Sequence, residues 1–267
     1  MNYRHSFHAG NFADLVKHAL VLWLVETLRP ATVIDTHAGA GLYDLSDDAS
    51  RSKEAEAGVA RLMTAEGRPP LLDALAARVA EVNPEGGVRY YPGSPLLIAQ
   101  ALGAGARYLG FELNPSVREL LSEALARCAN TEAREGDGYA AAARAQGLDA
   151  ALVLIDPPFE RPDDYVRAAE TALAVRTRDP SAVIAIWTPL KDLETFDGFV
   201  RRLEGRAGPT LVAEARLRPL TNPMKMNGCA MVVVNPPAGT EAAARDICDW
   251  VVSTLGEPGG RAEVWTF

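Results

Sequence analysis

The sequence predicts an α/β fold in which a mainly parallel sheet is covered by helices on both faces. Short apolar runs alternate along the chain with segments of helical periodicity, and polar or glycine-containing turns follow the apolar runs. The chain has 267 residues, of which 48% are hydrophobic and 23% are charged. This composition is typical of a globular protein with enough apolar residues to form a sizeable core.

The elements follow in order from this pattern. Apolar residues at helical spacing predict a first helix over residues 13–28, and residues 32–35 form the first predicted strand. Further strands are predicted at residues 108–112, 150–155, 181–188, 211–217 and 230–235. Helices between the strands are predicted at residues 116–128, 138–146 and 163–176.

The interval 46–89 does not fit the alternation. It is rich in charged, helix-prone sequence in two segments, 52–63 and 71–82, which are separated by glycine and proline. We therefore predict a helical insertion subdomain at 46–89 within a main domain formed by residues 1–45 and 90–267.

The last two predicted strands are connected differently from the others. Only residues 218–228 separate them, and this polar span contains Pro219, Pro223 and Gly228 without helical periodicity. Such a connection predicts an antiparallel hairpin. A parallel sheet that ends in an antiparallel hairpin resembles the seven-stranded, Rossmann-like class I methyltransferase fold, whereas an ordinary dinucleotide-binding sheet lacks the hairpin.

Composition excludes several classes of protein. A net charge of -8 argues against a protein that coats nucleic acid through a diffuse cationic surface. No apolar stretch reaches the roughly 18 to 20 residues of a membrane span, and the first ten residues lack the apolar run of a secretory signal. The three cysteines form no CxxC pair. We expect a cytoplasmic protein with free thiols and no membrane partner.

Three turns at predicted strand ends carry small or acidic residues. Gly39 and Gly41 allow a tight turn after the first strand, which is typical of a nucleotide-type pocket. Glu112 can accept hydrogen bonds from the hydroxyls of a cofactor ribose, or it can be an ordinary solvent-facing glutamate. Asp137 and Gly138 can hold an adenine amino group, or they can form a common Asp-Gly turn.

The string DPPF at Asp156 to Phe159 is the most specific of these signals. Two prolines in a row cannot continue a strand, and they hold the chain in an extended form. The Asp156 carboxylate and the Pro157 carbonyl can each accept a hydrogen bond from a planar exocyclic amine, and Phe159 offers a stacking face for its ring. The alternative interpretation is a strand-ending loop with a helix-capping aspartate.

The DPPF string resembles the [DNS]PP[YFW] motif of enzymes that methylate amino groups of adenine, cytosine and glutamine, with aspartate typical of adenine N6. A second candidate, Asn235-Pro236-Pro237, is followed by Ala238, which has no ring for stacking. It also falls in the predicted hairpin, away from the expected cofactor crevice. We therefore assign the motif to DPPF.

The segment YRHSFHAGN at residues 3–11, joined with DTHAGAG, YYPGSP, FELNP and DPPF, resembles the RlmJ family of bacterial 23S ribosomal RNA adenine-N6 methyltransferases. The resemblance implies S-adenosylmethionine as the cofactor and Asp156 as the catalytic residue, one that also lies at the cofactor. Further cofactor contacts are implied at His18, His37, Ser94, Glu112, Asp137 and Gly138. The implied residues near the target base are Tyr3, His5 and Lys17. Phe159 departs from the tyrosine that relatives commonly have.

The predicted function is methyl transfer to the N6 amino group of an unpaired or flipped adenosine in 23S ribosomal RNA, by a monomer. Arg4 and Lys17 are expected to bind phosphates. The four histidines lack a cysteine or paired carboxylate at ligand spacing, so we predict no metal. Ser94 can also cap a helix. The alternatives are DNA adenine-N6 methylation and a non-catalytic nucleic-acid binding or processing protein; a dinucleotide oxidoreductase leaves DPPF unexplained.

Overall fold

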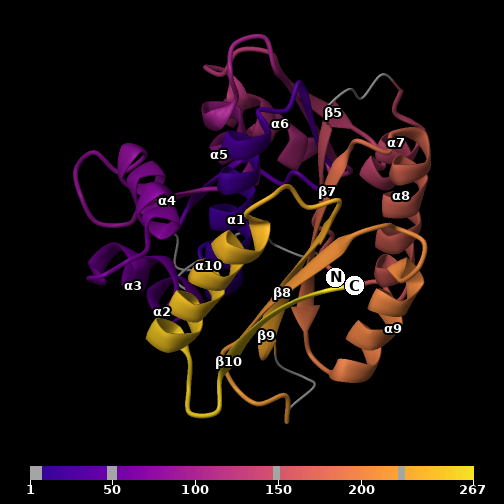
Figure 1. The fold of residues 1–267 in the computed structure, drawn as a ribbon. Coiled ribbons are helices and arrows are strands. Elements are labelled where there is room, and N and C mark those ends of the chain that lie inside the picture. The colour runs from indigo at the N-terminus through magenta and orange to yellow at the C-terminus, as the bar shows by residue number, and fades with distance from the viewer. Residues whose placement is uncertain (1–7, 47–52, 147–150, 222–225) are drawn as a thin grey trace.

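The computed structural model describes residues 8–46, 53–146, 151–221 and 226–267 of the chain, and over these residues the predicted α/β fold is confirmed. A central sheet lies between two layers of helices (Figure 1). Its eight strands, in the order β10-β8-β9-β7-β6-β1-β4-β5, are β1 (Thr32–Asp35), β4 (Arg107–Glu112), β5 (Thr131–Glu135), β6 (Ala151–Ile155), β7 (Val183–Leu190), β8 (Thr210–Arg216), β9 (Gly228–Val234) and β10 (Arg261–Thr266).

The sheet is parallel over β5, β4, β1, β6 and β7 and antiparallel beyond β7. Strand β9 pairs antiparallel with both β7 and β8, which confirms the predicted hairpin. The sheet is thus the Rossmann-like sheet of class I methyltransferases.

The predicted count of seven strands was wrong, because the main sheet of the described chain has eight. The additional strand, β10, pairs with β8 at the edge of the sheet. Its residues alternate between exposed and half-buried, so no apolar run marks it. The opposite edge strand, β5, is equally polar in sequence and was not predicted from its residues.

Helices cover both faces of the sheet. One face packs against α1 (Phe12–Leu28), α5 (Ser94–Ala101), α6 (Pro115–Leu125) and α10 (Thr240–Leu255). The other packs against α7 (Gly138–Arg144), α8 (Asp164–Arg178) and α9 (Leu193–Leu203). Figure 1 shows these two groups on opposite sides of the strands. None of the helices in the described part of the chain is long and apolar enough to cross a membrane.

The predicted insertion contains three short helices, α2 (Lys53–Ala57), α3 (Val59–Thr64) and α4 (Pro70–Glu81). The two-stranded sheet of β2 (Leu42–Asp44) and β3 (Tyr90–Pro92) joins the chain on either side of them. Their buried side chains share one apolar core with α1. The division of the chain into a main domain and an insertion subdomain stays a prediction.

Gly58 separates α2 from α3 within the segment that was predicted as one helix. A Cβ atom at this position would lie 2.2 Å from the carbonyl oxygen of Gly10. Glycine therefore allows the start of α3 to approach the backbone at the start of α1, where Val59 N donates to Gly10 O at 2.8 Å. This contact ties the inserted helices to the helix that carries part of the site.

Candidate active site

The turns after β1, β4 and β5 meet at the carboxyl edge of the sheet. The backbone N–H of Ala38 donates to Phe111 O at 2.9 Å, and that of Thr36 donates to Leu154 O at 3.0 Å. Gly136 N donates to Glu112 O at 3.1 Å. The three turns that the sequence marked are thereby joined in one region, which is the edge where open α/β sheets bind ligands.

Two features make this region close-packed. Gly39 and Gly41 have φ angles of 65° and 77°, which few other residues adopt without strain. A Cβ atom on Gly138 would lie 1.9 Å from the carbonyl oxygen of Thr36, so only glycine allows the start of α7 to approach the end of β1. At Gly39 the Tyr43 hydroxyl occupies the position of the missing side chain, so the glycine turn is tightly packed against its neighbours.

Asp35, at the end of β1, lies at the centre of a buried network. Its Oδ2 accepts hydrogen bonds from Ser94 Oγ at 3.0 Å and from the Tyr108 hydroxyl at 3.1 Å, and its Oδ1 accepts from His37 N at 3.3 Å. Burial and the nearby Asp156 carboxylate raise the pKa of Asp35 to about 6. A buried carboxylate next to another carboxylate is a favourable neighbour for a cation.

Ser94 does not cap the helix that it begins, so that alternative was wrong. The residue before α5 is Gly93, and no side chain caps the helix there. The Ser94 hydroxyl is directed to Asp35, and the side chain is buried.

His37 faces Tyr139, with ring centroids 4.5 Å apart in an edge contact. Desolvation lowers the pKa of His37 to about 4, so the ring is neutral at pH 7. The Thr36 hydroxyl donates to Leu154 O at 3.1 Å and lies 2.8 Å from His37 Nδ1. The Thr36 hydroxyl proton is used in the hydrogen bond to Leu154 O, so His37 Nδ1 must be the donor in its contact with Thr36 Oγ1. In the neutral ring, His37 Nε2 is then a hydrogen-bond acceptor.

Glu112 and Asp137 flank the same region, and they differ in how many of their carboxylate oxygens already have partners. Glu112 is half-buried, and its Oε1 accepts from Asn114 N at 2.9 Å. Asp137 caps α7 by accepting from Ala140 N at 3.2 Å, and it also pairs with Arg167. Burial opposes ionisation of Asp137, but these two donors hold its pKa below the ordinary value.

A buried chain of charges runs from α1 to the DPPF string. The ammonium of Lys17 lies 2.7 Å from Asp156 Oδ2 and 2.8 Å from Asp14 Oδ1. All three residues are buried. Burial alone would lower the pKa of Lys17, but the carboxylates of Asp14 and Asp156 raise it well above the ordinary value.

His18 extends this polar face of α1. Its Nδ1 lies 2.7 Å from the Tyr91 hydroxyl, the two rings stack with centroids 5.5 Å apart, and its Nε2 is 3.9 Å from Asp14 Oδ1. Lys17 and His18 follow Asp14 at three and four residues, so all three side chains lie on one side of the helix.

Phe159 lies in an aromatic cluster beside Asp156. Its ring centroid is 4.5 Å from that of Tyr165 and 5.9 Å from that of Trp187, and the side chain is 7% exposed. The φ angle of Phe159 is 50°, which is strained for a bulky residue and occurs most often at functional sites. The Lys17 ammonium lies 5.8 Å from the centre of the Trp187 ring.

Two acceptors of the DPPF string are unused. Oδ2 of Asp156 binds Lys17, but across the chain segments that the structure describes no donor reaches Oδ1 of Asp156 or the carbonyl oxygen of Pro157. Both residues are buried as a whole, but Asp156 Oδ1 is not among the fully buried side-chain atoms without a partner, so it is open to an incoming donor. The pair is suited to bind the two hydrogens of an amino group.

Other predicted residues fall outside this cluster. Tyr3, Arg4 and His5 lie outside the described residues, and their roles stay predictions. The Asn235-Pro236-Pro237 run follows β9, whose last residue pairs with Ile184 near the start of β7. It therefore lies at the opposite edge of the sheet from Asp156, which agrees with assigning the motif to DPPF.

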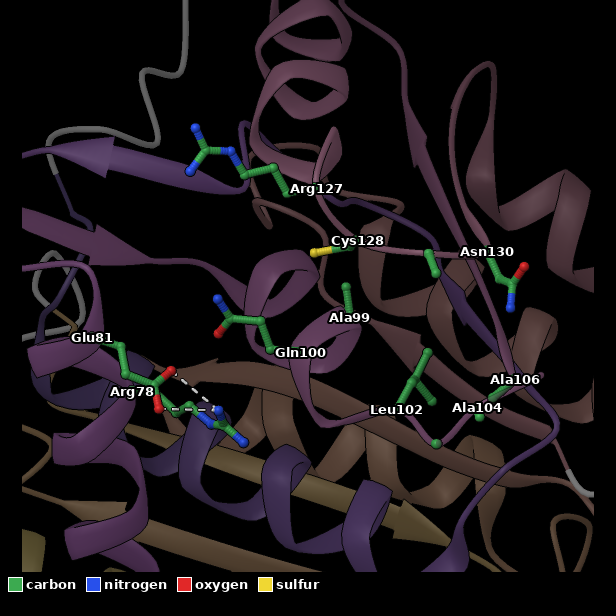
Figure 2. A pocket seen from close by; sticks show the side chains of 12 residues that line it. Arg78, Glu81, Ala99, Gln100, Leu102, Ala104, Ala106, Arg127, Cys128 and Asn130 are labelled. Atoms are coloured by element: carbon green, nitrogen blue, oxygen red, sulfur yellow. Dashed lines mark hydrogen bonds and ion pairs between the residues drawn. The ribbon is translucent and has the colours of Figure 1, made fainter.

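A cavity of about 410 Å³ also lies at that opposite edge, before β4 and β5. Figure 2 shows Arg78 paired with Glu81 on its rim and Gln100, Arg127 and Cys128 around it. None of the predicted site residues lines this cavity. No group of three or more His, Cys, Asp or Glu side chains in the described ranges can hold a metal ion, and the metal-free reaction stays a prediction.

Sequence reasoning missed three residues of the site, Asp14, Asp35 and Trp187. Asp14 had a detectable signal, because a charged residue three and four positions before Lys17 and His18 in an otherwise apolar helix marks a polar face. Asp35 ends an apolar strand beside the glycine turn, a position that often faces a ligand. Trp187 had no local signal, since aromatic residues are common in buried strands.

Comparisons with known proteins agree on one family. Residues 29–267 match the family described as "Ribosomal RNA large subunit methyltransferase D, RlmJ". The Ribosomal RNA large subunit methyltransferase J of Escherichia coli strain K12 is 32% identical over 99% of this chain and 98% of its own length. The protein of the same name from Haemophilus influenzae is 31% identical over 96% of this chain and 94% of its own length.

A solved structure is also similar. The crystal structure of a protein from Legionella pneumophila covers 97% of this chain and 98% of its own, with a TM-score of 0.90 and 23% identity. This likeness shows that the two chains share their fold over essentially their whole length.

Proposed function

The chain belongs to the RlmJ family of large-subunit ribosomal RNA methyltransferases, and from this premise we propose that it methylates the N6 amino group of an adenine in 23S ribosomal RNA. The observation that carries the proposal is the pair of unused acceptors, Asp156 Oδ1 and Pro157 O, which belong to two buried residues of the string that ends in Phe159. An exocyclic amine offers two hydrogens in a plane, and its ring needs a stacking surface. The aromatic cluster and the two acceptors supply both.

The residues at the carboxyl edge suit S-adenosylmethionine as the cofactor. When bound, it supplies an electrophilic methyl group on a positively charged sulfur. The glycines of the turn after β1 and at the start of α7 let these two segments pack closely at the edge where open α/β sheets bind ligands. The carboxylates of Asp35 and Asp156 make the region attractive to a cation.

Each proposed cofactor contact has a chemical reason. Neutral His37 presents an acceptor, and half-buried Glu112 keeps one oxygen for the ribose hydroxyls. Ser94 holds Asp35 in place. The remaining proposed contacts are His18, Gly39, Gly41, Asp137 and Gly138.

The reaction requires orientation of a poor nucleophile. The adenine N6 lone pair is delocalised into the ring, and the amine is too weak an acid for a carboxylate to deprotonate beforehand. Hydrogen bonds from the amine to Asp156 Oδ1 and Pro157 O favour pyramidal geometry at nitrogen and direct the lone pair toward the methyl group. Such positioning is worth several kcal/mol in well-organised sites.

Positive charge develops on N6 as the new N–C bond forms. The Asp156 carboxylate stabilises that charge and accepts the proton that the product nitrogen releases. Because the amine must be enclosed between Asp156 and the aromatic cluster, the adenosine has to leave its stack, so the substrate is unpaired or flipped. Tyr3, Arg4 and His5 are the proposed residues on the side of the base and its phosphates. Lys17 is proposed near the base, but it is buried and paired with Asp14 and Asp156, so the expectation that it binds phosphate does not fit the structure.

Asp156→Ala tests the proposal. We expect loss of methyl transfer to RNA in a radiolabelled assay, with the affinity for S-adenosylmethionine in isothermal titration largely unchanged. The control is Glu241→Gln, which changes an exposed carboxylate in the first turn of α10; this helix follows β9 at the opposite edge of the sheet from Asp156. Turnover by Asp156→Ala similar to the wild type would exclude Asp156 as the catalytic residue.

The substrate polymer is tested in cells. Mass spectrometry of 23S ribosomal RNA nucleosides with and without the gene should show N6-methyladenosine only when the gene is present. An unchanged RNA with loss of the modified base from DNA would favour the DNA enzyme. No change in either polymer would favour a non-catalytic binding protein.

A further inference from the structure

The polar face of α1 contains a carboxylate for which the proposed reaction has so far needed no role. Asp14 is 7% exposed, and its Oδ1 lies 2.8 Å from the Lys17 ammonium. Its Oδ2 accepts the backbone N–H of Gly10 at 2.9 Å. Both oxygens therefore have defined partners, one in the start of α1 and one in the charged chain that leads to Asp156.

The position of Asp14 is itself held from two directions. The Asn11 side chain caps α1 by accepting from Ala13 N at 2.9 Å and from Asp14 N at 3.1 Å. The carbonyl of Gly10, whose N–H binds the carboxylate, accepts from Val59 N at the start of α3. The inserted helices thus reach Asp14 through a single residue, Gly10.

Resting on the proposed function, we propose that Asp14 is a positioning residue that holds the Lys17 ammonium against one oxygen of Asp156. Lys17 then occupies Oδ2 of Asp156 and leaves Oδ1 for the substrate amine. With two carboxylates around one ammonium, the group keeps a net negative charge. Without the second carboxylate, the buried Lys17 would lose its proton more easily, and a neutral Lys17 would no longer hold Oδ2 of Asp156 in place.

If Asp14 has this role, it should raise the pKa of Lys17, which can be measured. A buried ammonium has a lowered pKa unless carboxylates compensate for the lost hydration, and here both Asp14 and Asp156 do so. The charged and titratable groups around the ammonium are, from α1, Asp14 and His18; from the segment after β6, Asp156; from β3, Tyr91; and from β9, Cys229. Asp35 is close enough to Asp156 for the two carboxylates to repel each other.

The test follows the Lys17 side chain by NMR in protein labelled with ¹³C-lysine, assigned with Lys17→Arg. In the wild type we expect no titration of Lys17 below about pH 10. In Asp14→Asn, which keeps an acceptor for Gly10 N, the midpoint should fall by about one pH unit or more, a tenfold loss of proton affinity. Asp14→Glu should restore most of it.

The single-turnover rate of methyl transfer provides the second measurement. It should fall in Asp14→Asn as pH rises through the lowered Lys17 midpoint, while the wild-type rate stays level. The matched control is Glu214→Gln, a buried carboxylate that is paired with Arg216 on β8, away from the site. This control should lose stability without a change in the pH profile.

Two results overturn the inference: an unchanged Lys17 midpoint in Asp14→Asn, or a wild-type Lys17 that already titrates below its ordinary value. The second result is measured on the wild type, so the inference can be refuted even if the Asp14→Asn protein does not fold. If the wild type methylates no RNA, the proposed function fails, whereas the titration still decides whether Asp14 sets the charge of Lys17.

Discussion

Replacing Gly138 by alanine tests the close packing of the strand-end turns. The added Cβ atom would lie 1.9 Å from the carbonyl oxygen of Thr36, although real Cβ contacts essentially never fall below 3.0 Å. The clashing atoms belong to the backbone, so no side-chain rotation relieves the contact. The turn after β1 and the start of α7 must move apart, which widens the proposed cofactor site.

We expect a loss of about 3 kcal/mol in the free energy of unfolding, the upper part of the usual range for overpacking. For a chain of this size each kcal/mol lowers the Tm by about 2 °C or more, so the midpoint should fall by about 6 °C. The affinity for S-adenosylmethionine should fall as well, because Thr36 adjoins His37. Urea unfolding, thermal melts and isothermal titration measure these effects.

The matched control is Gly198→Ala in α9, where the added Cβ atom meets nothing within 4 Å. There the same chemical change should stabilise the protein by up to about 1 kcal/mol, because alanine favours a helix more than glycine does. If Gly138→Ala unfolds at the same urea concentration as the wild type, the two turns are not packed as described.

Three further predictions concern the same region. The pKa of Asp35 is about 6 in the folded chain against an ordinary 3.8, so as pH rises from about 4 to 6 the unfolded chain releases the Asp35 proton first. The difference in free energy of unfolding between the wild type and Asp35→Asn should therefore fall by about 3 kcal/mol over this range, measured by urea unfolding. A difference that stays constant with pH would contradict this. Asn11→Ala removes the cap of α1 and should cost about 1 kcal/mol in thermal unfolding; no measurable loss would mean that the cap is dispensable. Phe159→Leu keeps an apolar side chain but loses the stacking ring, so the KM for RNA should rise about tenfold in the methyl-transfer assay with unchanged cofactor affinity, and an unaltered KM would remove Phe159 from the base site.

Much of the fold is readable from the sequence because the central strands are buried on both faces. Residues 150–155 and 181–188 form continuous apolar runs for this reason, and β6 and β7 were predicted within two residues of their bounds. The edge strands β5 and β10 expose one face or more, and their polar sequences do not differ from those of loops. Pairing with a neighbour made them strands, and local sequence does not encode that pairing.

Some residues of the candidate site were likewise predictable from local sequence, and others were not. Asp156, Pro157 and Phe159 were predicted because consecutive prolines after an apolar run are a local and unusual pattern. The contact between Lys17 and Asp156 joins residues 139 positions apart, and no local pattern reports it. The same holds for Asp35, which gains its partners Ser94 and Tyr108 only in the folded chain.

The sequence by itself determined the class of fold, the edge of the sheet where the site lies and the family to which the chain belongs, because these depend on periodicity and on short motifs. The tertiary structure alone decided the charges of the site: Lys17 shared by Asp14 and Asp156, and Asp35 shifted toward neutrality. Electrostatic interactions in a buried region depend on distance and desolvation, and both arise only when distant segments pack together.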